Sequence, residues 1–275
     1  ILPRREESSG RRRTAKRSSN RLLLGLVILL ATILVGEVIY HFVLVPYFRI
    51  TQIVVESDQR VPEEVVRNLA GITPGSSLLT LSPGATAERI AAHPAVRSVE
   101  VARSFPDTLV LSVATRRPVA VVLTELEGSV EAILVDEEGV LFERGALTPE
   151  KAADLRLPVL SGLQLQEFSG GMDLPIRLVG LASRLKEMQL DSPELFRQIS
   201  EVRVVPRGSH EFELLVYPMS YPVALRMSSD FTSEQLTYSL VVLDALRQDG
   251  RLAELSEVDA RGEEMVLRLR EEAGG

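Results

Sequence analysis

The longest apolar run in the chain lies near its beginning, at residues 22–45. Its first fifteen residues carry no charge, and only Glu37 and His41 interrupt the remainder. As an α-helix rising about 1.5 Å per residue, the run is about 36 Å long, which exceeds the roughly 30 Å of a bilayer's hydrocarbon core. The pattern therefore predicts one transmembrane helix. A cleaved signal peptide is the alternative, but no Ala-x-Ala-like site follows Gly36, and further apolar residues come next.

Glu37 and His41 lie four residues apart on one face of this helix, toward its outer end. An ionisable side chain inside a membrane is costly, so by default it indicates contact with a partner helix or a water-filled site. Alternatively, the two groups contact each other as an i,i+4 pair and reach toward the outer headgroups. Both interpretations stay open, and we retain the two residues as candidates for an intramembrane contact.

The residues after this helix predict a compact β-α-α-β-β unit. Gly71 is placed to stop the first of its helices, and His93-Pro94 closes the second, because the residue before a proline avoids the helical region. The Pro106-Asp107 pair predicts the turn between the last two strands. Such a unit buries a three-stranded sheet under two helices. In order, the expected elements are a strand at 48–55, helices starting near Pro62 and Thr86, and strands at 96–103 and 108–116.

The rest of the chain alternates β-strand patterns with two amphipathic helices, which favours helices packed on a mostly antiparallel sheet. The predicted fold class is α+β, with one transmembrane helix, a first domain at 49–117 and a β-rich domain with flanking helices at 118–270. One helical stripe comprises Leu174, Leu178, Leu181, Leu185 and Met188, and the other comprises Leu236, Leu240, Leu243 and Leu246. Strands are expected at 132–142, with a turn at 136–139, and at 199–205, 211–217, 221–227, 256–259 and 264–269.

Charge is divided unevenly along the chain. Residues 1–21 hold eight basic and two acidic groups, a net charge of +6. Since the whole chain carries −7, residues 22–275 carry a net charge of −13. Short basic flanks stay on the cytoplasmic side, which predicts a cytoplasmic N-terminus and exported domains. The basic segment 1–21 is expected to be a disordered tail, with a binding motif for a cytoplasmic partner as the alternative, and 271–275 a second short tail. The acidic exported part gives no indication of nucleic-acid binding.

Candidate catalytic groups do not assemble into a recognisable site. Ser183 and Lys186 match a Ser-x-x-Lys motif, but its Lys-Thr-Gly companion is missing, and a solvated helix face explains them better. The histidines His41, His93 and His210 have no zinc-site spacing. The acidic residues 136–138 fall at a predicted hairpin tip, where we expect the charges to be solvated. Without cysteine, disulfides and thiolate metal sites are excluded. We expect no catalysis, no cofactor, no metal and no small-molecule substrate.

Recognition through a sheet edge is the interaction that the pattern favours instead. An edge strand presents unpaired N–H and C=O groups to which a partner strand can add. The final strand is followed only by a polar tail, and we expect it to be this edge. Its residues are Glu264, Met265, Val266, Leu267, Arg268 and Leu269.

Several short motifs occur in order along the chain: Phe48-Arg49-Ile50, Gly75-Ser76-Ser77-Leu78-Leu79, Ala92-His93-Pro94-Ala95-Val96, Phe105-Pro106-Asp107-Thr108-Leu109, Arg117-Pro118-Val119-Ala120, the hairpin Ile133-Leu134-Val135-Asp136-Glu137-Glu138-Gly139-Val140-Leu141-Phe142 and Leu157-Pro158-Val159-Leu160-Ser161-Gly162. Together they resemble the FtsQ family, called DivIB in some bacteria. In that family a POTRA domain follows a single N-in transmembrane helix, and a β-domain follows the POTRA domain. The resemblance implies a POTRA domain at 49–117 and an FtsQ-type β-domain at 118–270.

The resemblance implies a non-enzymatic scaffold of the bacterial division machinery. In the family, the last strand of the β-domain binds the division protein FtsB, which forms a coiled coil with FtsL. The POTRA domain and anchor are associated with recruitment, including contact with FtsK, and the protein helps to control septal peptidoglycan synthesis. We therefore expect partners of these kinds, among them septal synthase components. The expected location is the division septum in the bacterial inner membrane, with the C-terminal domains in the periplasm.

One family signature before the last strand, Asp-Leu-Arg-Tyr, appears here as Asp259-Ala260-Arg261-Gly262. The resemblance implies that Asp259 and Arg261 bind the partner. Arg261 is a candidate for an ion pair with a partner carboxylate. The alternative is that both only orient the turn. Gly262 replaces the family's aromatic residue, so that part of the contact is expected to differ.

Two other classes of protein remain as alternatives. A membrane-anchored cell-wall enzyme would need a site that the motifs do not reveal. An export or outer-membrane assembly factor with POTRA domains would bind β-strands by the same mechanism, but it is expected to have several such units or a barrel.

Overall fold

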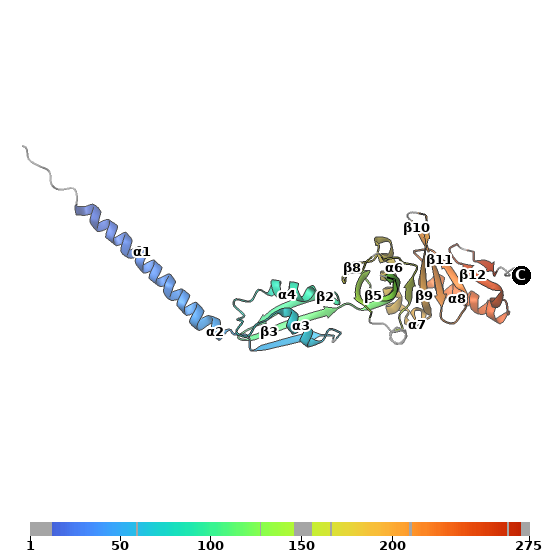
Figure 1. The fold of residues 1–275 in the computed structure, drawn as a ribbon, viewed down its shortest axis with the longest axis horizontal. Coiled ribbons are helices and arrows are strands. Elements are labelled where there is room, and N and C mark those ends of the chain that lie inside the picture. Colours follow the sequence, from blue (N-terminus) through green and yellow to red (C-terminus); the bar gives the residue numbers. More distant parts are fainter. Residues whose placement is uncertain are drawn as a thin grey trace, which may run out of the picture. The chain divides into compact units, whose positions relative to one another are not determined.

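The computed structural model describes residues 13–58, 60–126, 128–145, 156–165, 167–208, 211–262 and 264–270. The chain divides into two compact units (Figure 1). The first unit comprises residues 1–56, 62–89 and 100–112, and the second comprises residues 57–61, 90–99 and 113–275. Residues 1–12 of the predicted tail at 1–21, the whole predicted tail at 271–275 and the histidine at position 210 lie outside the described residues.

A long helical segment opens the described chain. Helix α1 spans Arg13–Ile39 and passes into a π-helical turn, η1, at Tyr40–Leu44, and then into α2 at Val45–Tyr47. By length and composition, Leu22–Tyr47 is long and apolar enough to cross a membrane. Its large apolar side chains are exposed all round, as a helix designed for lipid requires. Helical structure thus begins at Arg13, within the basic segment, and not at the first apolar residue.

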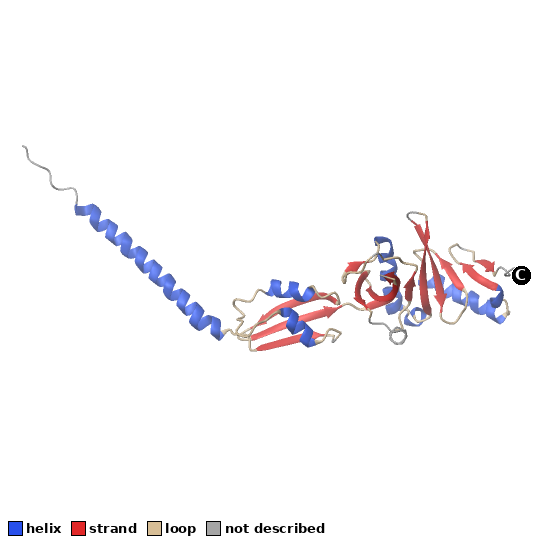
Figure 2. Ribbon diagram, viewed as in Figure 1, coloured by secondary structure: helices blue, strands red, loops and turns tan. Residues whose placement is uncertain are grey.

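A three-stranded sheet follows, with two helices lying over its strands (Figure 2). The strand order is β1-β3-β2, which confirms the β-α-α-β-β unit expected from the sequence. Gly71 ends α3 with φ of 64°, the left-handed conformation that glycine adopts without steric cost. The elements are β1 at Gln52–Ser57, α3 at Glu63–Ala70, α4 at Pro83–Ala91, β2 at Val96–Ser104 and β3 at Thr108–Thr115.

The second sheet has ten strands in the order β13-β12-β11-β10-β9-β7-β4-β5-β6-β8. Most neighbouring pairs are antiparallel, as predicted, but β4–β7, β7–β9 and β11–β12 are parallel. The strands are β4 at Pro118–Leu126, β5 at Ser129–Asp136, β6 at Val140–Arg144, β7 at Val159–Ser161, β8 at Met172–Asp173, β9 at Ile199–Arg207, β10 at Glu211–Pro218, β11 at Ala224–Met227, β12 at Leu255–Asp259 and β13 at Val266–Leu269.

Helices cover the core face of this sheet. They are α6 at Ile176–Asp191, α7 at Pro193–Phe196, α8 at Ser233–Gln248 and the 3₁₀ turn η2 at Leu252–Glu254. The predicted stripe of α6 is buried in the core, and so is most of that of α8, where Leu240 is partly buried. Helix α8 begins with a capping box in which Thr232 and Gln235 satisfy each other's backbone N–H groups. It also supplies the crossover that the parallel β11–β12 pair requires.

Substitution of Leu185 tests the packing of α6 on the sheet. Its side chain is fully buried, so Leu185→Ala should leave a cavity and lower the free energy of unfolding by about 2–5 kcal/mol. Leu190 lies on the same helix at 66% exposure, and Leu190→Ala should change stability by no more than about 0.5 kcal/mol. Denaturant unfolding of the full chain in detergent, followed by circular dichroism, measures both. Equal effects of the two variants would contradict the assigned helix face.

Candidate partner-binding edge

Strand β13 forms one end of the ten-stranded order and pairs with β12 alone. Its register places Val266 opposite Asp259 and Arg268 opposite Glu257. Val266 and Leu269 are 58% and 64% exposed. Among the described residues, no strand pairs with its other side. The predicted edge is therefore present, although the strand begins at Val266, and Glu264 and Met265 precede it.

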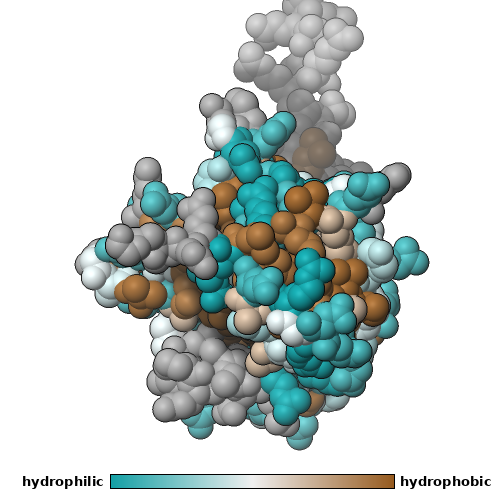
Figure 3. Space-filling model, turned by 90° about the vertical axis from the view of Figure 1, so that its right-hand side faces the viewer, coloured by the Kyte–Doolittle hydropathy of each residue, from teal (hydrophilic) through white to brown (hydrophobic). Residues whose placement is uncertain are grey.

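The two faces of β13 differ in chemistry because side chains alternate along a strand. Leu267 and the preceding Met265 pack against the hydrophobic core on the α8 side. Arg268 lies on the opposite face, where its guanidinium contacts Glu257 at 3.5 Å and Asp259 at 3.3 Å. The space-filling view in Figure 3 shows apolar and hydrophilic areas side by side at this end of the molecule.

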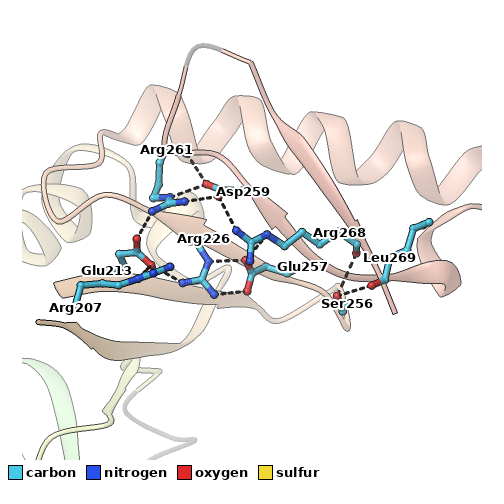
Figure 4. Close-up of polar contacts among 9 residues, drawn as sticks. All are labelled: Arg207, Glu213, Arg226, Ser256, Glu257, Asp259, Arg261, Arg268 and Leu269. Atoms are coloured by element: carbon cyan, nitrogen blue, oxygen red, sulfur yellow. Dashed lines mark hydrogen bonds and ion pairs between the residues drawn. The ribbon is translucent and has the colours of Figure 1, made fainter. Parts of the chain in front are cut away.

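A network of ion pairs runs across the polar face from β9 to β13 (Figure 4). Arg226 in β11 is at its centre, with bonds of 2.5 and 2.7 Å to Glu257 in β12 and one of 2.5 Å to Glu213 in β10. Arg207 contacts Glu213 at 2.9 Å. Arg261 donates to Asp259 at 2.6 and 2.8 Å and also contacts Glu213. The network thus ties five adjacent strands together through their side chains.

Arginine side chains shield the carboxylates of this network. The side chains of Glu213, Glu257 and Asp259 are only 11–13% exposed. Arg207, Arg261 and Arg268 are 51%, 35% and 46% exposed. Four arginines face three carboxylates, so the set carries a net charge of +1. The more exposed side chains of this set are therefore all cationic, although the chain as a whole is acidic.

The network also shifts the proton affinities of its members. Hydrogen bonds from Arg261 hold the pKa of Asp259 below its ordinary value. Burial alone would raise the pKa of Glu213, but hydrogen bonds from Arg226 and Arg207 outweigh it, and the pKa is lowered. The bonds to Glu257 raise the pKa of Arg226 above its ordinary value. All three shifts favour the charged forms near neutral pH.

The structure brings Asp259, Arg261 and Arg268 together in one ion-pair network and adds members that the sequence patterns did not reveal. Arg207, Glu213, Arg226 and Glu257 lie far from the predicted motif in sequence. The sequence did contain one indication of this network: Arg226 interrupts the apolar run Val223-Ala224-Leu225-Arg226-Met227. A charged residue in such a run needs buried partners.

Gly262 borders a hollow of about 360 Å³ beside the edge. Tyr238 of α8, Arg261 and Met265 also line it. Tyr238 is 60% exposed. An aromatic ring thus lines the same hollow as Gly262, and it comes from helix α8 and not from the residue after Arg261.

The other candidate residues make structural contacts. Ser183 donates to the carbonyl oxygen of Glu137 at 3.0 Å, and Nζ of Lys186 lies 3.7 Å from the Glu137 carboxylate. Nδ1 of His93 accepts from the backbone N–H of Ala95 at 3.3 Å. Within the described part of the chain, no cluster of three or more His, Cys, Asp or Glu side chains could hold a metal ion.

The acidic hairpin tip is paired and not merely solvated, contrary to our expectation. Asp136 is 2% exposed and contacts Arg116 at 2.5 Å. It also accepts from the backbone N–H of Val140 at 2.8 Å, which fixes the turn. Glu138 binds both Arg116 and Arg97, at 3.0 and 2.8 Å. The turn's charges thus belong to a structural ion-pair cluster within the second unit.

One apolar helix, a β-α-α-β-β unit and a larger, mostly antiparallel sheet with an open edge together define a POTRA-type protein with an apolar N-terminal anchor. The family model for the POTRA domain, FtsQ-type, matches residues 48–116. The cell division protein FtsQ of Anaeromyxobacter sp. (strain K) is 30% identical over 214 residues, which cover 78% of this chain and 68% of that protein. The chain belongs to the FtsQ family of cell division proteins.

Two further relatives have the same description. FtsQ of Syntrophotalea carbinolica is 31% identical over 150 residues, or 54% of this chain and 50% of that protein. FtsQ of Myxococcus fulvus is 31% identical over 164 residues, or 58% of this chain and 53% of that protein. The match thus spans about half the length of these two relatives.

A pH titration tests the place of Asp259 in the network. Because its pKa is lower in the folded than in the unfolded chain, its ion pairs stabilise the fold above about pH 4. That contribution is lost as the pH falls through the folded pKa. The free energy of unfolding should therefore fall less steeply below pH 4 in Asp259→Asn than in the parent chain, as measured by denaturant unfolding at pH 3–7. The exposed Asp173→Asn should retain the parent slope, and an unchanged slope in Asp259→Asn would refute this role.

Proposed function

We propose that this protein is a non-enzymatic scaffold of the division machinery, anchored in the inner membrane at the septum. Membership of the FtsQ family supports a role in division. The basic segment before the anchor supports a cytoplasmic N-terminus and periplasmic domains, because basic flanks are retained in the cytoplasm. In this proposal a POTRA domain at 49–117 and a β-domain at 118–270 link early and late division proteins.

The C-terminal edge is the proposed binding site for a coiled-coil partner of the FtsB/FtsL type. The observation that carries this proposal is the open side of β13 next to a face of exposed arginines. An added strand would gain main-chain hydrogen bonds from β13. Acidic side chains of the same strand would pair with Arg261 and Arg268, whose own carboxylate partner, Asp259, is shielded beneath them. The proposed site comprises Asp259, Arg261, Glu264, Met265, Val266, Leu267, Arg268 and Leu269.

Binding at this edge would contribute to the control of septal peptidoglycan synthesis by bringing division proteins together. FtsK and components of the septal synthase are the further partners proposed, with the POTRA domain and anchor as their contact regions. An interface of one short strand is small, but confinement to a membrane raises the effective concentration of tethered partners. Weak contacts therefore suffice for assembly.

Proline at position 266 tests strand addition. Val266→Pro removes a backbone N–H from a four-residue strand and should abolish capture of an FtsB/FtsL-type partner in a pull-down with the full chain. Val266→Thr keeps both the N–H and the β-branched shape, so it should capture the partner normally. Far-ultraviolet circular dichroism checks that both variants fold. Normal capture by a folded Val266→Pro chain would refute the edge-strand site.

Localisation tests the division role itself. A fluorescent fusion of the full chain should concentrate at midcell in dividing cells, because a scaffold works where its partners assemble. The Val266→Pro fusion should still reach the membrane, since the anchor is unchanged. A uniform envelope signal from the parent fusion would argue against the proposed function.

A further inference from the structure

The chain passes from the apolar span into the first β-α-α-β-β unit without a linker. Phe48 caps the C-terminal end of α2. Its carbonyl oxygen accepts hydrogen bonds from the N–H of Leu78 at 2.8 Å and from Oγ of Ser77 at 3.0 Å. Three residues later, the N–H of Thr51 donates to the carbonyl oxygen of Asp107 at 3.0 Å. Backbone hydrogen bonds thus hold the end of the span beside the turn that connects β2 and β3, all within the first unit.

That turn carries an exposed aromatic ring next to the end of the span. The ring of Phe105 packs edge-to-face on the ring of Phe48, with 5.4 Å between their centroids. Phe48 packs in the same manner on Tyr47, at 5.1 Å. Phe105 and Tyr47 are 56% and 68% exposed. Tyr47, Phe48 and Phe105 therefore form one juxtamembrane cluster, and its two outer members are largely uncovered.

The length of the span sets the depth of this cluster. The 26 residues of Leu22–Tyr47 form a helix about 39 Å long, which exceeds a hydrocarbon core of roughly 30 Å by about 9 Å. A centred span therefore ends about 4–5 Å outside the core, within a headgroup layer that is about 5–7 Å thick on each side. Because the ring of Phe105 lies 5.4 Å from that of Phe48, the residue after Tyr47, it lies in or beside the same layer.

Two arginines flank the juxtamembrane cluster. Arg49 directly follows Phe48, Arg103 precedes Phe105 by two positions, and both are exposed. Arg103 donates to the carbonyl oxygen of Leu81 at 2.6 Å. Among the residues that the structure describes, no carboxylate pairs with either guanidinium. Guanidinium groups bind phosphate, and long basic side chains reach headgroups from the membrane boundary. Aromatic rings beside two such cations match a phospholipid, which has acyl chains below a phosphate.

The position of the juxtamembrane cluster selects the bilayer as what covers it. The side chains of the span are exposed all round, so lipid surrounds the helix up to Tyr47, and the same lipid surface continues to Phe105. Aromatic side chains favour this boundary because it removes their apolar surface from water. The carboxylate of Asp107 in the same turn accepts hydrogen bonds from the hydroxyls of Thr51 and Thr108, which lowers the cost of holding it near headgroups.

We propose that the turn between β2 and β3 is a second membrane contact. In this contact the ring of Phe105 inserts at the boundary between headgroups and acyl chains, and Arg49 and Arg103 bind headgroup phosphates. With the span as the first contact, the turn fixes the tilt of the three-stranded unit on the bilayer. The contact depends on the anchor spanning the membrane. It is separate from the β13 edge and goes beyond the proposed function, in which the anchor alone attaches the protein.

Tryptophan fluorescence provides the test, because the chain contains no tryptophan and one substitution introduces the only indole. The full chain is reconstituted alone in vesicles of phosphatidylcholine and phosphatidylglycerol, with lipids brominated near the headgroup end or near the methyl end of their acyl chains. The emission of Phe105→Trp should be quenched at least about threefold more by the shallow bromines than by the deep ones, because aromatic rings at the interface lie at headgroup level.

Val54→Trp is the matched control in the same unit. Val54 is 42% exposed on β1 and lies six residues beyond Phe48, up to about 20 Å along an extended chain. Its emission should respond to acrylamide in the water and be quenched at least about threefold less by shallow bromines than that of Phe105→Trp. Equal bromine quenching of the two variants would overturn a contact made through the turn. Far-ultraviolet circular dichroism checks that each variant keeps the parent fold.

Tyr47→Trp separates failure of this contact from failure of the anchor. Shallow bromines should quench it, since it marks the end of the span. If they quench Tyr47→Trp while only acrylamide quenches Phe105→Trp, the turn does not enter the bilayer, and the proposal is overturned in favour of water or a protein partner at Phe105. If bromines quench neither variant, the span itself is wrong, and the contact that depends on it is overturned as well.

Neutral substitutions test the headgroup contacts. In the Phe105→Trp chain, Arg49→Gln combined with Arg103→Gln should reduce quenching by shallow bromines at least about twofold and increase quenching by acrylamide, because basic side chains hold the turn at the charged surface. Arg67→Gln removes an arginine of α3 that pairs with Glu63 at 3.5 Å, and it should change neither value. Unchanged quenching in the double variant would refute the arginine contacts. The vesicles contain no division partner, so these results are independent of capture at β13.

Discussion

The guanidinium of Arg226 is the group on which the C-terminal end of the large sheet depends. It is buried in the second unit and bridges Glu213 of β10 and Glu257 of β12. Breaking a buried ion pair by removal of one partner is strongly destabilising, because the remaining charge has neither water nor a counter-charge. These three residues therefore hold β12 in place. The strand that pairs with β13 is thus fixed by charges as well as by its backbone.

Strand β13, by contrast, is held by few contacts. Four residues form it, Leu267 anchors it to the core, and Arg268 joins the charged face. Natural sheets keep edge strands short and charged because such edges do not aggregate readily. Within the part of the chain that the structure describes, the other side of β13 has no strand paired with it. The ion-paired strands thus give the short edge strand a rigid support.

The membrane anchor also contains polar groups, but they lie in hydrocarbon and not in water. In water, the exposed Glu37–His41 pair would have little effect, since surface ion pairs contribute little to the free energy of folding. In hydrocarbon, the unsatisfied groups of that pair favour any contact that supplies a partner. A helix that is otherwise apolar all round thereby gains one defined point of contact. Among the described residues, the span and the edge strand thus share hydrogen-bonding groups that the chain itself leaves incompletely paired.

The sequence by itself determined the features that arise from short-range physics. Apolar length defined the span from Leu22, periodicity identified the buried faces of α6 and α8, and Gly71 marked the end of α3. The order β-α-α-β-β and the last strand as an edge also followed from local patterns. Each of these depends on residues within a few positions of one another.

Only the tertiary structure decided which distant segments meet. The parallel β11–β12 pair requires the α8 crossover, and the Arg226 bridges join residues 13 and 31 positions away. Asp136 is buried because Arg116, twenty positions earlier, reaches it, although a hairpin tip is normally solvated. Side-chain periodicity records which face of a strand is buried but not which strand lies beside it. For that reason the edge could be predicted from the sequence, whereas the cationic face that supports it could not.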